Sequence, residues 1–344
     1  MKSLLNYQPS ELVDWLAQVG EPRYRAAEIL NWIFKRQAND FGEMSSLPIA
    51  LRRQLGENFR LFDSKELARS ESEGGTIKIL LGWSDGATTE SVMIPAPNDN
   101  PRRTVCISTQ VGCDVGCRFC ASGIGGSIRD LEIGEVVEQA VVVSRLLAAR
   151  QERLSHIVFM GMGEPLANYE VTIEAVRRFN AEWGLGIGQR KITLSTVGLP
   201  KQIERLADEG LQITLAVSLH APNDRLRQQL IPWAKGIPLA RLLEACRQYR
   251  RKTGREVTFE YCLLDGVNDL EEHAFQLGKI ARSLRAHVNL LMYNPVDDLP
   301  FERPSRNHAI EFLKRLRAAG VTAHLRESRG LANDAACGQL RRSV

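Results

Sequence analysis

The sequence predicts an α/β fold: an incomplete (β/α)6 barrel preceded by a small helical unit and a linking β-hairpin. From about residue 103 onward, short apolar segments alternate with amphipathic segments, which is typical of a parallel sheet covered by helices. Before residue 72, apolar residues recur at helical spacing instead. Between them, "TIKILLGWSDGATTESVMIP" alternates around Ser-Asp-Gly, which is a hairpin signal. We therefore expect a helical accessory domain (1–72), a hairpin (73–98) and a barrel with a C-terminal tail (99–344).

Three helices are expected in the accessory domain. The segment "SELVDWLAQVG" places apolar residues on one helical face, with Ser10 as a candidate N-cap and Gly20 as a stop. Residues 23–37 and 47–59 carry similar patterns. Together they predict a compact helical unit.

Seven segments of the barrel read as strands, with helical patterns such as 132–150, 168–181 and 200–208 between them. The strands are expected at 104–109, 156–161, 191–196, 212–220, 257–264, 287–293 and 321–327. In such barrels the working groups lie on loops at the carboxyl ends of the strands. Polar motifs follow five of these strands: the cysteine loop, "GMGEP" at 161–165, Ser195, "SLHAP" at 218–222, and Asn294 in "YNP". One shared site at that rim is therefore predicted.

Three cysteines of the first loop have the spacing C-x3-C-x2-C: Cys113, Cys117 and Cys120. Iron–sulfur clusters with four irons ordinarily take four thiolates, so three leave one iron open for substrate. The alternatives are a structural zinc with Cys106 as the fourth ligand, or thiols with no metal. For Cys246 and Cys262 we expect plain core packing.

Composition excludes several classes of protein. Asp and Glu interrupt every apolar run before eighteen residues, so no membrane span is expected. Seven cysteines, four of them in one segment, argue against a disulfide scaffold and favour the cytoplasm. The net charge is only +4, yet residues 225–255 hold nine Lys or Arg against Glu244, with Trp233 and Tyr249 among them. That stretch is either a solvated helix face or a polyanion-binding surface.

Longer motifs resemble a known family. "CISTQVGCDVGCRFCASG", "FMGMGEPLANY", "TLSTVGL", "SLHAPND", "MYNP" and "DAACGQL" are together similar to the RlmN/Cfr family of radical S-adenosylmethionine (SAM) ribosomal RNA adenine methyltransferases. The resemblance covers essentially the whole chain and is closest to the branch that methylates carbon 2. It implies a radical-SAM barrel and a helical domain that contacts RNA.

The resemblance also implies a cofactor site. Cys113, Cys117 and Cys120 would bind a [4Fe-4S] cluster whose open iron holds SAM. Gly163 and Glu164 would hold the methionine amino group of SAM. The rest of the cofactor pocket would come from Ser195, Ser218, Leu219, His220 and Asn294.

Three further residues match the family's reaction machinery. Cys337 would carry a methyl group, Cys106 would resolve the covalent protein–RNA intermediate and form a disulfide with Cys337, and Glu90 would handle a proton. Two SAM molecules would be consumed per methyl transferred. The implied partners are 23S ribosomal RNA, with transfer RNA as a second candidate, and an electron donor such as flavodoxin or ferredoxin; we expect a monomer and no membrane. Carbon 8 as the target stays open, as do a zinc-stabilised RNA-binding protein and a radical enzyme with another substrate.

The chain departs from the family pattern at three positions. Asp130 stands where relatives often have Asn, and Leu331 with Ala332 where they have acidic or small residues. The second difference lies in the segment that must deliver Cys337.

Overall fold

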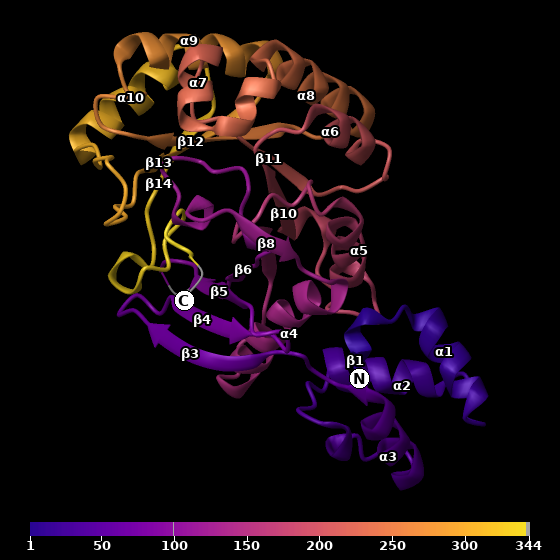
Figure 1. Ribbon diagram of the computed structural model, residues 1–344. Helices are drawn as coiled ribbons and strands as arrows, with labels where there is room; N and C mark the ends of the chain where they lie inside the picture. The colour runs from indigo at the N-terminus through magenta and orange to yellow at the C-terminus, as the bar shows by residue number, and fades with distance from the viewer. Residues whose placement is uncertain (99, 342–344) are drawn as a thin grey trace.

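The computed structural model describes residues 1–98 and 100–341 (Figure 1). Its N-terminal unit contains α1 (Pro9–Gln18), α2 (Arg25–Phe34) and α3 (Ile49–Asn58), as predicted, and the short strands β1 (Lys2–Ser3) and β2 (Phe59–Arg60) pair in parallel. The prediction of Ser10 as an N-cap is wrong: α1 begins at Pro9, whose fixed φ suits the first helical position. Gly20 does follow the helix with a positive φ of 78°.

One ten-stranded sheet organises the rest of the chain. Its order is β14-β13-β12-β11-β10-β9-β6-β5-β4-β3, so each strand lies beside its neighbour in the sequence apart from the inserted β7–β8 pair. Strands β6 and β9 to β14 run parallel, and β3 to β6 are antiparallel to one another. The sheet does not close, because β14 and β3 are its two edges. The predicted incomplete barrel is confirmed.

Six β/α units followed by a last strand build the barrel. All seven predicted strands form: β6 (Arg103–Cys106), β9 (His156–Phe159), β10 (Ile192–Thr196), β11 (Thr214–Ser218), β12 (Val257–Leu263), β13 (His287–Met292) and β14 (Ala323–Arg326). The helices lie along their outer side (Figure 1): α4 (Ile133–Ala149), α5 (Tyr169–Asn180), α6 (Pro200–Leu206), α7 (Asp224–Leu230), α8 (Leu239–Thr253), α9 (Glu271–Leu284) and α10 (Arg306–Ala318).

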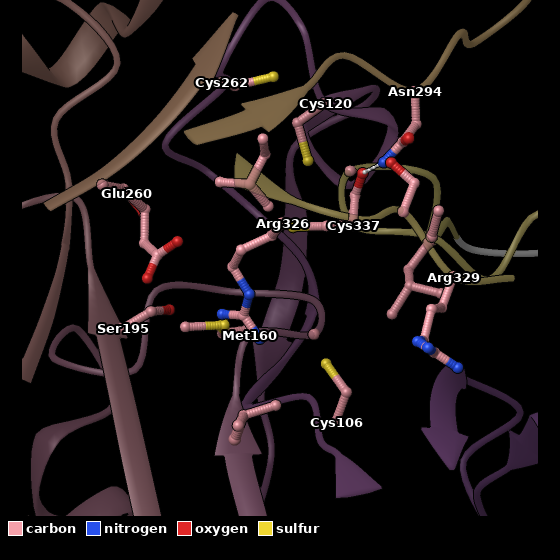
Figure 2. Close-up of a pocket in the computed structure, with 18 of the residues that line it drawn as sticks. Cys106, Cys120, Met160, Ser195, Glu260, Cys262, Asn294, Arg326, Arg329 and Cys337 are labelled. Atoms are coloured by element: carbon pink, nitrogen blue, oxygen red, sulfur yellow. Dashed lines mark hydrogen bonds between the residues drawn. The ribbon is translucent and has the colours of Figure 1, made fainter. Parts of the chain in front are cut away.

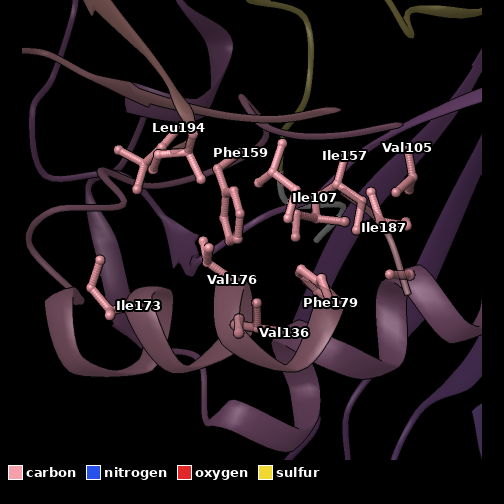
Figure 3. Packing of buried hydrophobic residues seen from close by; sticks show 14 of the residues in the cluster. Val105, Ile107, Val136, Ile157, Phe159, Ile173, Val176, Phe179, Ile187 and Leu194 are labelled. Atoms are coloured by element: carbon pink, nitrogen blue, oxygen red, sulfur yellow. The ribbon is translucent and has the colours of Figure 1, made fainter. Parts of the chain in front are cut away.

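Alternate side chains of each barrel strand enter the core. In β9, Ile157 and Phe159 are fully buried, whereas Val158 between them points to the inner face. Figure 3 shows this layer: strand residues such as Phe159 and Leu194 pack on Val176 and Phe179 of α5. The period of two thus sends apolar residues outward to the helices and leaves the inner face free for other side chains.

The predicted hairpin is present as β4 (Ile77–Gly82) and β5 (Thr88–Pro95), paired antiparallel around the Ser-Asp-Gly turn. The strand β3 (Lys65–Glu71) extends it and was not predicted. It lies within the segment 1–72 that we expected to be helical, but it belongs to the main sheet. The division into three domains stays a prediction.

Within the described part of the chain, no helix has the length and apolar character that crossing a membrane requires.

Candidate functional site

A cavity of about 510 Å3 lies on the inner face of the sheet, in the barrel (Figure 2). Its walls come from the inner residues of the strands, from loops that follow them, and from the C-terminal tail. Of the predicted site residues, ten line it: Cys106, Cys113, Cys117, Cys120, Gly163, Glu164, Ser195, Ser218, His220 and Asn294. Cys337 is the eleventh. The predicted rim therefore forms one site.

The cysteine loop is held closed at its base. Two short strands that sequence reasoning missed, β7 (Gln110–Gly112) and β8 (Ser127–Asp130), pair antiparallel on either side of it. Gly112 has a φ of +86°, and a Cβ there would stand 2.1 Å from the carbonyl oxygen of Gly126. Only glycine fits this close approach of the two backbones. The closed base directs the loop toward the cavity.

The three thiols of this loop suit iron–sulfur ligation. Burial raises the pKa of Cys113 to about 12 and also raises the pKa of Cys117 and Cys120, so without a cation each is a neutral thiol. Metal ligands are thiolates, so binding a metal would release the protons. Among the described residues, no three His, Cys, Asp or Glu side chains converge on a position for a single metal ion. Three separated soft ligands fit a larger cluster better than the zinc site we considered.

Arg227 adds a positive charge behind the loop. Its side chain is fully buried, and its Nη2 donates to the carbonyl oxygen of Val197 at 2.5 Å. Its Nε and Nη1 have no hydrogen-bond partner among the described residues. The guanidinium is near enough to Cys117 to favour the thiolate. Unpaired buried donors beside thiol ligands fit an anionic cluster, because hydrogen bonds and positive charge stabilise its sulfurs.

Glu164 ties two rim loops together. Its Oε1 accepts from Leu166 N at 2.9 Å, and its Oε2 accepts from Val197 N, after β10, at 2.6 Å. Burial raises the pKa of this carboxyl to about 7, although the backbone donors oppose the change. Gly163 before it has a φ of +101°, and a Cβ there would meet Gln110 at 2.7 Å. Both residues line the cavity, while their contact with SAM stays a prediction.

His220 supports the wall of the cavity. Its Nδ1 accepts from Cys262 N at 3.0 Å, and the ring packs edge-on against Phe119 at 4.8 Å between centroids. Burial lowers the pKa of His220 to about 3, so the ring stays neutral. Ser195 is fixed by donating to Phe159 O at 2.7 Å. Leu219 is fully buried and is not among the cavity-lining residues.

Cys337 and Cys106 reach the same cavity from different elements. Cys106 is the last residue of β6 and is buried, whereas Cys337 is exposed and lines the cavity from the C-terminal tail. Asn294 fixes the tail by donating from Nδ2 to Cys337 O at 2.9 Å, the dashed line in Figure 2. Burial raises the pKa of each thiol to about 12. Both are free thiols here.

Glu90 lies outside the cavity wall. It is buried on β5, where its Oε1 pairs with Lys78 Nζ at 3.0 Å and its Oε2 accepts from Arg341 N at 2.9 Å. Both oxygens are therefore engaged by the sheet and the tail. Its predicted role with a proton is not tested by this placement.

Several residues that line the cavity were not predicted from the sequence. Glu260 of β12 is buried, accepts from Asn289 Nδ2 at 2.9 Å, and has its pKa raised by burial. Arg326 of β14 reaches into the cavity beside it (Figure 2). Cys262, expected in the core, also lines the cavity, whereas Cys246 is in the core as predicted. The available signal was a charged residue inside an otherwise apolar strand, as in "VTFEYCLL".

Residues 225–255 expose less unpaired positive charge than their sequence suggests. Arg227 and Tyr249 are fully buried, so they cannot contact a partner on this surface. Four exposed members pair with acids, which leaves Arg225 and Lys235 as exposed charges: Arg241 pairs with Glu204, Lys252 with Asp208, and Arg247 and Arg251 with Glu244. This face therefore matches the solvated alternative better.

Comparisons with known proteins agree with this arrangement. The Radical SAM superfamily model matches residues 107–278, and the model of the ribosomal RNA large subunit methyltransferase N-terminal domain matches residues 2–61. The chain is 45% identical to a probable dual-specificity RNA methyltransferase RlmN of Thermosynechococcus vestitus, covering 99% of this chain and 98% of that one. It is 47% identical to a protein of that name from Rhodopirellula baltica, covering 99% and 91%.

A crystal structure of a radical SAM methyltransferase from Sphaerobacter thermophilus is 45% identical, with a TM-score of 0.96 and 99% of both chains covered. Membership of the superfamily implies a [4Fe-4S] cluster and SAM. Full-length identity, the paired domain models and the shared fold lead to one conclusion. The chain belongs to the RlmN family of radical SAM RNA methyltransferases.

Proposed function

We propose that this chain methylates carbon 2 of an adenine in 23S ribosomal RNA and, as a dual-specificity enzyme, an adenine in transfer RNA. The observation that carries the proposal is that Cys337 and Cys106, from the tail and from β6, line one cavity with the three-cysteine loop. The printed names of the relatives, dual-specificity RNA methyltransferases, support the substrate class.

Carbon 2 of adenine lies between two ring nitrogens and is electron-poor, so it does not displace a methyl group from a sulfonium by polar attack. A carbon radical can add to it. Cys113, Cys117 and Cys120 would hold the [4Fe-4S] cluster, which would supply the electron that cleaves SAM to a hydrogen-abstracting radical. A first SAM would methylate Cys337 and a second would supply the radical, which makes two SAM per methyl transferred.

The chain's own residues would do the rest. Cys337 would present its methyl group, which would lose a hydrogen atom to the radical from SAM, and the resulting carbon radical would add to carbon 2. Loss of one electron and of the carbon-2 proton would leave a thioether between Cys337 and the base. The Cys106 thiolate would then attack Cys337 Sγ, forming a disulfide, while the carbon leaves with the bonding electrons and takes up a proton. Two electrons from outside must reduce the disulfide before the next cycle. The buried walls would exclude water from the radical.

The cavity is lined by three carboxylates, those of Glu164, Glu260 and Glu327, and by three guanidinium groups that can meet the phosphates of RNA. The guanidinium groups are those of Arg102, Arg326 and Arg329, and none of them forms an ion pair within the described residues. Burial lowers the pKa of Arg102, and repulsion from the nearby Arg326 guanidinium lowers it further. Phosphates relieve such repulsion, so binding of RNA should weaken as salt rises.

An enzyme of ribosomal and transfer RNA works in the cytoplasm, where we place this one, as a monomer that receives electrons from flavodoxin or ferredoxin.

Product analysis tests the proposal. The anaerobically reconstituted enzyme is incubated with SAM, a reductant and 23S or transfer RNA, and digested nucleosides are compared with 2-methyladenosine and 8-methyladenosine standards. We expect 2-methyladenosine from wild type and none from Cys337→Ala. Appearance of 8-methyladenosine would select the alternative carbon. RNA left unmodified by brown protein with about four irons per chain would reject RNA as the substrate.

A further inference from the structure

The segment that carries Cys337 is attached to the antiparallel extension at both ends. Before Cys337, Lys78 Nζ donates to the carbonyl oxygen of Asp334 at 3.2 Å. After it, Glu90 Oε2 accepts from Arg341 N at 2.9 Å. Lys78 and Glu90 are themselves paired at 3.0 Å between Nζ and Oε1. One ion pair thus reaches both flanks of the Cys337 segment.

The register of the sheet makes this arrangement possible. Lys78 of β4 lies opposite Val92, and Glu90 is two residues before Val92 on β5. They are therefore diagonal neighbours on one face, within reach of a long side chain. The same face carries Val92, which clusters with Cys106 and with Ala335 and Leu340 of the tail. Figure 1 shows the C-terminal segment beside this part of the sheet.

The cysteine loop holds the opposite side of the tail. Ala121 N donates to Gly338 O at 2.7 Å, and Ser122 Oγ donates to Leu340 O at 2.6 Å. Both donors follow Cys120 directly. The tail therefore lies between the cysteine loop and the β4–β5 face, and its position is fixed from two directions.

We propose that Lys78 and Glu90 form a clamp that places Cys337 for methyl transfer; this inference rests on the proposed function. Both are positioning residues, since neither lines the cavity. The Glu90 side chain is only 4% exposed and the Lys78 side chain 19%, so the ion pair is shielded from solvent and each charge depends on the other. Holding the tail is a role of Glu90 separate from its predicted role with a proton, which these contacts do not test.

Variants at positions 78 and 90 separate the tail contact from the predicted role of Glu90 with a proton. Lys78→Met removes the ammonium from both Asp334 and Glu90 but leaves a carboxylate at position 90. Glu90→Ala removes the acceptor of the Arg341 amide. Glu90→Gln keeps an amide oxygen that can still accept from Arg341 or Lys78, but it cannot take up a proton at neutral pH. Lys65→Met, on the exposed strand β3, is the matched control.

Two measurements on the reconstituted full chain test the clamp. Hydrogen exchange followed by mass spectrometry reports opening of residues 334–341, and the ratio of methylated adenine to 5′-deoxyadenosine reports how well SAM cleavage is coupled to transfer. Loss of a hydrogen bond to a charged group predicts at least about tenfold faster exchange and an equally lower ratio for Lys78→Met and Glu90→Ala. Tail exchange in Glu90→Gln should stay within about threefold of wild type, and Lys65→Met should match wild type in both measurements.

Unchanged tail exchange in Lys78→Met would overturn the clamp. So would normal transfer in Lys78→Met, because that variant removes the clamp and leaves the carboxylate at position 90 in place. If a variant does not fold, wild type still decides: the Arg341 amide should be protected, and free exchange there refutes the proposal. Absence of methylated adenine from wild type would reject the proposed function, while the exchange data would still test the clamp.

Discussion

Replacing Glu164 by alanine should destabilise the barrel rim measurably. The change removes the acceptor of two buried backbone N–H groups, those of Leu166 and Val197. Leaving a buried donor unpaired costs about 1–3 kcal/mol, so two cost about 2–6 kcal/mol. Burial raises the pKa of this carboxyl to about 7, so burying it already costs free energy, and the alanine variant is spared that cost. We therefore expect a loss in the lower half of that range, about 2–4 kcal/mol.

Thermal unfolding of matched reconstituted proteins measures this effect. At about 2 °C per kcal/mol for a chain of this size, the Tm should fall by roughly 4–8 °C. Glu164→Gln keeps one acceptor oxygen and should lose about half as much. Glu73→Ala, in the exposed β3–β4 turn, is the control and should change the free energy of unfolding by less than about 0.5 kcal/mol. A Tm within about 1 °C of wild type for Glu164→Ala would refute the reasoning.

Three further predictions concern the site and its surroundings. Cys106→Ala should accumulate a covalent protein–RNA adduct visible on denaturing gels, whereas Cys337→Ala should cleave SAM and transfer nothing; an adduct in the second variant would contradict the assignment. Arg227→Gln should lower the reduction potential of the reconstituted cluster, measured by redox titration with electron paramagnetic resonance, because it removes a buried positive charge near Cys117; an unchanged potential would argue against that contact. Burial, with Arg102 and Lys191, lowers the pKa of His156 to about 4, so the folded state binds fewer protons than the unfolded state and loses stability as pH falls from about 6.5 toward 4. In His156→Asn the Tm should fall less steeply with falling pH than in wild type. The same slope of Tm against pH in both proteins would count against this prediction.

Much of the fold follows from the sequence because its strands carry a strong pattern. Buried strands such as Val257–Leu263 are apolar and bounded by helical segments, so all seven parallel strands could be predicted. The edge strand β3 could not: "KELARSE" is exposed along nearly its whole length and lacks apolar alternation. It is a strand because it pairs with β4, and such pairing cannot be read from the sequence of one segment alone.

The site was predictable where residues share a motif and not where distant elements meet. The three-cysteine loop and Glu164 could be expected at one rim from barrel topology alone. The position of Glu90 against Arg341 depends on how the tail packs on β5, which no local pattern encodes. Cys262 looked like a core residue because its strand is apolar, yet strand alternation turns it to the cavity.

The tail lying between the cysteine loop and the β4–β5 face also has a consequence for biogenesis. During synthesis, residues 1–326 leave the ribosome before Cys337, and earlier segments fold first. Until the tail is made, the loop that holds Cys113, Cys117 and Cys120 lacks its contacts with Gly338 and Leu340. The cavity therefore gains its last wall, including Cys337, from the residues that are synthesised last.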